Sequence, residues 1–165
     1  MKKENIKLMC LAGVFTAIVF VFTAYLHIPI HTGYIHIGDG FIYLASCILP
    51  LPYAVFVGAG GALLADCLTG FALWAPASVI IKAITVFFFC RKTHKIISKR
   101  NIFALVPSSL ICIGGYYIYD ALITGNFFSP IAAIWGNITQ CVFSSIVFIL
   151  IGITFDKIDI KKFIR

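Results

Sequence analysis

Residues 129–155 read SPIAAIWGNITQCVFSSIVFILIGITF, a stretch without a single charged side chain. A helix that crosses the roughly 30 Å hydrocarbon core of a bilayer needs about 20 mostly apolar residues. The stretch therefore predicts a membrane-spanning helix over Ser129–Phe155. The chain as a whole is 61% hydrophobic and only 12% charged, whereas soluble domains average about 45–50% and 25%. An integral membrane protein is expected.

Further apolar runs complete the predicted fold, an all-α integral membrane protein with a six-transmembrane-helix bundle in a single domain over residues 1–165. The second and fourth helices are short, so they are expected to be tilted or to end below one interface. The first is too long for the apolar region of a signal peptide. The other five runs are Lys7–His27, Ile37–Leu49, Tyr53–Leu68, Ala75–Phe89 and Ile102–Ile123.

All but one of the lysines and arginines fall in three clusters, before the first expected helix, between the fourth and fifth, and after the sixth. Six crossings place these clusters on one side of the membrane, and the positive-inside rule makes it the cytoplasmic side. The chain is thus expected in the cell membrane with both termini cytoplasmic, and its net charge of +7 requires no nucleic acid. The clusters are Lys2, Lys3 and Lys7; Arg91, Lys92, Lys95, Lys99 and Arg100; and Lys157, Lys161, Lys162 and Arg165.

The remaining basic residue, Lys82, lies inside the apolar segment ALWAPASVIIKAI (72–84). Pro76 suits the first turn of a helix that begins at the outer face, which puts Lys82 about 10 Å below that face. An isolated ammonium group at this depth costs about 2.5–3.5 kcal/mol or more. Lys82 is therefore expected to face the protein interior and to have a partner there.

Carboxylate and amide side chains are expected at a similar depth, in the outer half of the bundle. Asp39 begins the second helix, Asp66 ends the third, and Asp120 lies one turn before the outer end of the fifth. Asn137 and Gln140 are three residues apart and share one face of the sixth helix. Together with the buried lysine, these groups are the predicted polar contacts for a ligand.

Aromatic side chains fall in the same layer. A few convergent polar groups between aromatic walls are typical of a pocket for a flat, polar small molecule. Gly33, Gly38 and Gly40 make the segment 27–40 flexible, and its loop 28–36, which contains Tyr34, is expected to close over that pocket. The other aromatic residues of the predicted substrate-binding site are Trp74, Tyr116, Tyr117 and Trp135.

Each of these features also has a purely structural interpretation. Lys82 can pair with Asp66 as a structural bridge. Asp39 can cap the second helix, and Trp74 and Trp135 can belong to an interfacial aromatic belt.

No metal site and no enzymatic activity are expected. His27, His31 and His36 lie in one segment, HIPIHTGYIHIGDG (27–40), but their spacing matches no compact ligand pattern. The sequence contains no phosphate-binding loop, paired catalytic carboxylates or nucleophile elbow.

Small residues spaced four apart allow helix backbones to approach closely in lipid. On the first helix, Gly13 and Ala17 have this spacing and are expected to contact another protein. The third helix has two such pairs, which are expected to pack inside the bundle: Gly58 with Ala62, and Gly61 with Ala65.

Three motifs resemble the small substrate-binding S components of energy-coupling factor (ECF) vitamin transporters. They are Gly-Tyr-Ile-x-Ile-Gly-Asp at 33–39, Gly-Ala-Leu-Leu-Ala-Asp at 61–66, and Trp-Ala-Pro at 74–76 followed by Ile-Ile-Lys at 80–82. The segment GNITQ (136–140) lies where that family carries polar contacts on its sixth helix. The most similar subgroup holds components for hydroxymethylpyrimidine, pyridoxine and riboflavin.

The resemblance implies that the chain captures a vitamin or precursor outside the cell and then docks on a membrane T component carrying two ATP-binding subunits. The ATP cycle of these partners would rotate the chain and release the ligand inside, so that the chain itself binds no cofactor. The family's Ala-x-x-x-Ala contact with the T component would fall on Gly13 and Ala17, or one step earlier on Ala12 and Thr16. Residues carried over as pocket residues are Lys82, Asp66, Asn137 and Gln140.

Two other functions are open at this point. A self-contained proton- or cation-coupled carrier would use Lys82 with Asp66 and Asp120. A structural subunit of a larger membrane complex would bind no small ligand.

Overall fold

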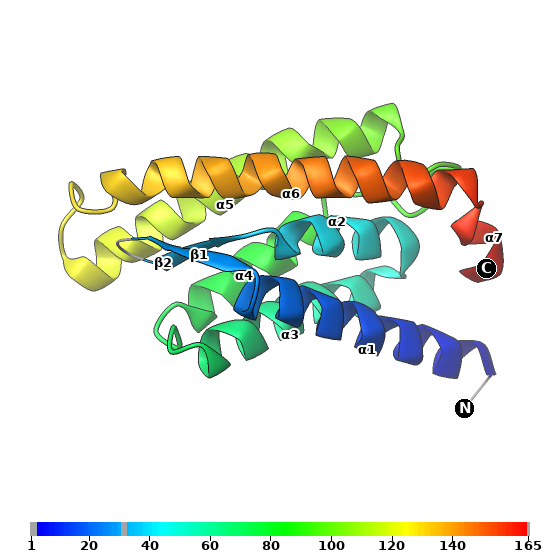
Figure 1. Ribbon diagram of the computed structural model, residues 1–165, viewed down its shortest axis with the longest axis horizontal. Helices are drawn as coiled ribbons and strands as arrows, with labels where there is room; N and C mark the ends of the chain where they lie inside the picture. Colours follow the sequence, from blue (N-terminus) through cyan, green and yellow to red (C-terminus); the bar gives the residue numbers. More distant parts are fainter. Residues whose placement is uncertain (1–2, 31–32, 165) are drawn as a thin grey trace.

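The computed structural model describes residues 3–30 and 33–164. Figure 1 shows long helices side by side, with the start of α1 and the end of α7 at one end of the bundle and a β-hairpin directed toward the other. We call these the terminal end and the hairpin end. The elements are α1 (Lys3–Ala24), β1 (His27–Ile30), β2 (Gly33–His36), α2 (Gly38–Ile48), α3 (Leu51–Leu68), α4 (Ala75–Val86), α5 (Lys99–Thr124), α6 (Ile131–Lys157) and α7 (Ile160–Ile164).

The expected six-helix membrane fold is confirmed. Within the described residues, α1, α3, α5 and α6 are long and apolar enough to cross a bilayer, while α2 and α4 are shorter apolar helices. The short α2 is central, because every one of its residues is buried and it contacts α1, α3, α4 and α6. This short helix is therefore enclosed by its neighbours.

The loop expected over 28–36 instead contributes two antiparallel strands, His27–Ile30 and Gly33–His36, with Ile28 opposite Ile35. Ile28 and Ile30 alternate along β1 and Ile35 lies in β2, and β-branched residues favour extended backbone. The prediction of an irregular loop was therefore wrong in its local structure.

Several helix ends also differ from those predicted from hydropathy. The fourth helix ends at Val86, and a turn with backbone bonds from Phe88 to Thr85 and from Phe89 to Val86 follows it. Phe89 is buried, so the apolar run continues past the helix. At the start of α5, the Ser98 hydroxyl accepts a bond from the backbone N–H of Asn101, and this polar cap places the helix start before the apolar run begins.

The small residues of α3 pack inside the bundle, as predicted. A Cβ atom on Gly61 would lie 2.6 Å from Val19 of α1, and one on Gly58 would lie 3.1 Å from Ile42 of α2. Larger side chains at these positions would force the helices apart.

The two candidate partner-contact registers on α1 face in different directions. Ala12 and Thr16 are buried, and the Thr16 hydroxyl donates to the Ala12 carbonyl at 2.8 Å. Gly13 and Ala17 are exposed, and a Cβ atom on Gly13 would have no atom within 4 Å. The Ala12–Thr16 register is therefore unavailable to a partner, whereas the Gly13–Ala17 register is open.

Candidate functional site

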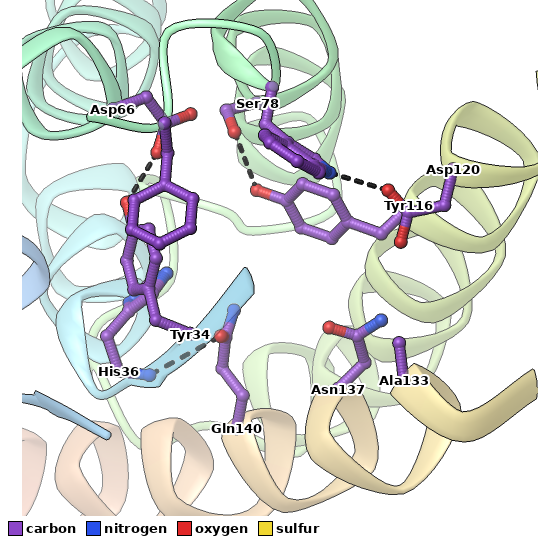
Figure 2. A pocket seen from close by; sticks show the side chains of 11 residues that line it. Tyr34, His36, Asp66, Ser78, Tyr116, Asp120, Ala133, Asn137 and Gln140 are labelled. Atoms are coloured by element: carbon purple, nitrogen blue, oxygen red, sulfur yellow. Dashed lines mark hydrogen bonds between the residues drawn. The ribbon is translucent and has the colours of Figure 1, made fainter. Parts of the chain in front are cut away.

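A pocket lies at the hairpin end, where β2, α3, α4, α5 and α6 converge (Figure 2). Its empty volume is about 450 Å³, including its open mouth. Most of its wall consists of aromatic and polar side chains. The lining residues are Tyr34, His36, Asp66, Phe71, Trp74, Ser78, Tyr116, Asp120, Ala133, Asn137 and Gln140.

The polar face predicted on the sixth helix is present. Asn137 and Gln140 both point from α6 into the cavity in Figure 2. The other candidates that line it are Tyr34, Asp66, Trp74, Tyr116 and Asp120.

Tyr34 holds the hairpin over one side of the pocket. The Tyr34 hydroxyl donates a short hydrogen bond to Oδ1 of Asp66, at the end of α3. The Tyr34 ring also packs on Phe71, with ring centroids 4.7 Å apart. Burial, and next the charge of Asp66, raise the pKa of Tyr34, so that the phenol keeps its proton and acts as the donor.

Two hydrogen bonds link the residues that form the wall opposite Tyr34. The Trp74 indole Nε1 donates to Oδ1 of Asp120 at 2.5 Å, and the hydroxyls of Ser78 and Tyr116 are 2.9 Å apart. These bonds connect α5 with α4 and the residue before it. The two bonds hold the aromatic rings of Trp74 and Tyr116 against this wall of the pocket.

Lys82 lies beneath the pocket and does not line it. Its Nζ is 2.9 Å from both oxygens of Asp39, and the two side chains are 2% and 1% exposed. The ammonium group also lies 5.1 Å from the centre of the Tyr116 ring. The expectation of a buried, partnered lysine is met, but the predicted ligand contacts of Lys82 and Asp39 are replaced by a buried ion pair.

Two structural interpretations from the sequence are wrong as well. Lys82 pairs with Asp39 rather than with Asp66. The residue at the N-cap of α2 is Ile37, without a side-chain capping bond, so Asp39 is not a cap. Because α2 is buried all round, its first-turn carboxylate meets the lysine of α4 instead of water.

Gln140 connects this ion pair to the pocket wall. Its Nε2 donates to Oδ2 of Asp39 at 3.0 Å, and its Oε1 accepts from the backbone N–H of His36 at 3.4 Å. One amide thus joins α6, α2 and the hairpin. The ion pair therefore supports the pocket through Gln140 and Tyr116.

Two predicted aromatic contacts point elsewhere. Trp135 is 75% exposed, because it precedes Asn137 by two residues and so lies about 200° around the helix from it. The Tyr117 hydroxyl donates to the Phe127 carbonyl at 2.9 Å, outside the pocket. Trp135 therefore lies outside the pocket, whereas Trp74 lines it.

The lining residues missed from the sequence are His36, Phe71, Ser78 and Ala133. His36 is two residues from Tyr34, and a β-strand places residues with this spacing on the same face. The spacing indicates a shared face only if the segment is known to be a strand, which the sequence did not predict. Burial lowers the pKa of His36 to about 4, so the ring is neutral, and its Nδ1 accepts from the Gly38 N–H at 3.2 Å.

No cluster of His, Cys, Asp and Glu side chains able to hold a metal ion is found within residues 3–30 and 33–164. His31 lies outside these residues.

Comparison with known proteins gives one family. The model of the family described as "ECF-type riboflavin transporter, S component" matches residues 3–157. A search of curated protein sequences gives no match.

Proposed function

The chain belongs to the family of ECF-type riboflavin transporter S components, and on this basis we propose that the pocket at its hairpin end captures a small heteroaromatic vitamin or precursor from outside the cell. Membership makes the chain the substrate-binding, non-enzymatic subunit of a vitamin importer. Riboflavin, hydroxymethylpyrimidine and pyridoxine are the candidate ligands.

The observation that carries the proposal is the composition of the pocket wall. Tyr34, Phe71, Trp74 and Tyr116 surround one cavity with aromatic surface. Flat heteroaromatic rings stack favourably on such surfaces, and the amides of α6 can bond to ring substituents. A ligand bound with nanomolar affinity needs about −12 kcal/mol, which an enclosed aromatic slot with a few polar contacts can supply.

We propose that the hairpin acts as the cover of this site. Its only side-chain bond to α3 among the described residues is that between Tyr34 and Asp66. Opening that bond would free the mouth of the pocket without disturbing the ion pair beneath it. A ligand that later occupies the pocket can restore contact between the hairpin and α3.

The proposed orientation places the hairpin end outside and both termini in the cytoplasm, in line with the basic clusters. The exposed Gly13 and Ala17 of α1 are the proposed contacts with the T component. Its two ATP-binding subunits supply the energy, and this chain binds no nucleotide.

Reconstitution in liposomes tests the proposal. The purified chain alone should bind the vitamin, detected by native mass spectrometry of co-purified ligand, but should not accumulate it. Addition of the T component, both ATP-binding subunits and internal ATP should produce uptake. Accumulation by the chain alone under a proton gradient would support the carrier alternative instead, and a chain that never holds a small ligand would support a structural subunit.

A further inference from the structure

The buried carboxylate of Asp66 can accept more hydrogen bonds than the protein supplies. The side chain is 4% exposed, and its Oδ1 accepts the bond from Tyr34. Its Oδ2 is buried and makes no hydrogen bond of regular geometry with any residue that the structure describes. In Figure 2 this oxygen points toward the Ser78 side of the pocket. The Ser78 hydroxyl on this side is a hydrogen-bond partner of the Asp66 carboxylate. An ionised carboxylate can accept about four hydrogen bonds, so Asp66 keeps the capacity to accept a further donor from a ligand.

The charges around the pocket indicate which kind of donor fits. Asp66 and Asp120 both line the cavity, and no lysine or arginine does among the described residues. The buried cation beneath, Lys82, is already paired with Asp39. An anionic ligand would meet carboxylates without a compensating charge, whereas a neutral or cationic N–H group would satisfy the free oxygen.

We propose that the ligand presents an N–H group on the edge of its ring to Oδ2 of Asp66, and that the pocket admits only unphosphorylated forms. The group is an amino substituent, a ring imide or a protonated ring nitrogen. This inference rests on the proposed capture of a heteroaromatic vitamin and specifies its chemistry. The ring then lies between the aromatic walls, with its donor edge toward α3.

Pairs of probes that differ only in the N–H group test the proposal. One pair is hydroxymethylpyrimidine, which carries an amino group, and its analogue without that group. The other is riboflavin and its derivative methylated at the imide nitrogen. For each parent compound that binds the wild-type protein, calorimetry should show at least tenfold weaker binding of the blocked partner, and the phosphate ester of the parent should also bind at least tenfold more weakly.

The variant Asp66→Asn places an NH₂ group where Oδ2 stands and keeps an acceptor for Tyr34. It should bind the parent compound at least tenfold more weakly than the wild type does. Its affinities for the parent and for the blocked analogue should differ by less than twofold. Asp159→Asn makes the same change at an exposed carboxylate near the terminal end and should behave like the wild type. The thermal midpoint of each variant checks its folding, and the probe pairs on wild-type protein need no variant.

The outcomes distinguish the role of Asp66 from the capture of a vitamin. Equal binding of parent and blocked analogue by the wild type would overturn the role of Asp66 and leave vitamin capture standing. Tight binding of a phosphate ester would overturn the exclusion of anions. Failure of every parent compound to bind would contradict the proposed function itself.

Discussion

Replacing Lys82 by methionine is expected to lower the free energy of unfolding by about 3–5 kcal/mol, because the change leaves Asp39 as an uncompensated charge in the protein interior. Both side chains are almost fully buried. Methionine is close in size to lysine, so the loss is electrostatic rather than steric. Denaturant unfolding in detergent micelles, followed by circular dichroism, measures the effect.

A second substitution separates this explanation from general damage. The double variant Lys82→Met with Asp39→Asn removes both charges and keeps an acceptor for Gln140, so it should recover most of the lost stability. Lys162→Met is the matched control, since Lys162 pairs with Asp159 at 2.6 Å but is 74% exposed; its unfolding midpoint should not change. No recovery in the double variant would contradict a role as an ion pair.

Replacing Gly13 by leucine is expected to reduce ATP-driven uptake at least tenfold while ligand affinity changes less than twofold. A Cβ atom on Gly13 would touch nothing within the chain, so the substitution should fold normally. It would, however, keep a partner helix from approaching the backbone of α1. Uptake by the reconstituted complex and calorimetry on the isolated chain give the two values.

Gly114→Leu provides the matched control on another helix. A Cβ atom on Gly114 also has no neighbour within 4 Å, but this glycine lies on α5, away from the proposed contact. Its uptake should equal that of the wild type. Equal losses in both variants, or normal uptake with Gly13→Leu, would remove α1 from the partner interface.

Sequence patterns predicted the fold well because hydropathy and charge asymmetry act over whole helices. They also brought Asp66, Asn137 and Gln140 to one level of the bundle, since depth follows from distance to a helix end. Depth does not determine which neighbour a side chain meets. Asp39 was expected to contact ligand, but the complete burial of α2 turns it to Lys82.

Direction around a helix was the other source of error. The spacing of Trp135 and Asn137 already shows that they lie on different faces, so this mistake was avoidable from the sequence. The placement of His36 and Phe71 was not, because it depends on the hairpin and on the tertiary contact of Tyr34 with α3.

The central claim is that the aromatic cavity at the hairpin end holds the vitamin, and the two tryptophans of the chain test it most directly. Trp74 lines the cavity, whereas Trp135 is 75% exposed on the outside of α6. With the vitamin identified by native mass spectrometry, calorimetry should show that Trp74→Ala weakens binding about tenfold or more, since loss of one stacked ring costs about 1.4 kcal/mol or more. Trp135→Ala should stay within twofold of the wild type. Unchanged binding with Trp74→Ala, or an equal loss with Trp135→Ala, would contradict the account.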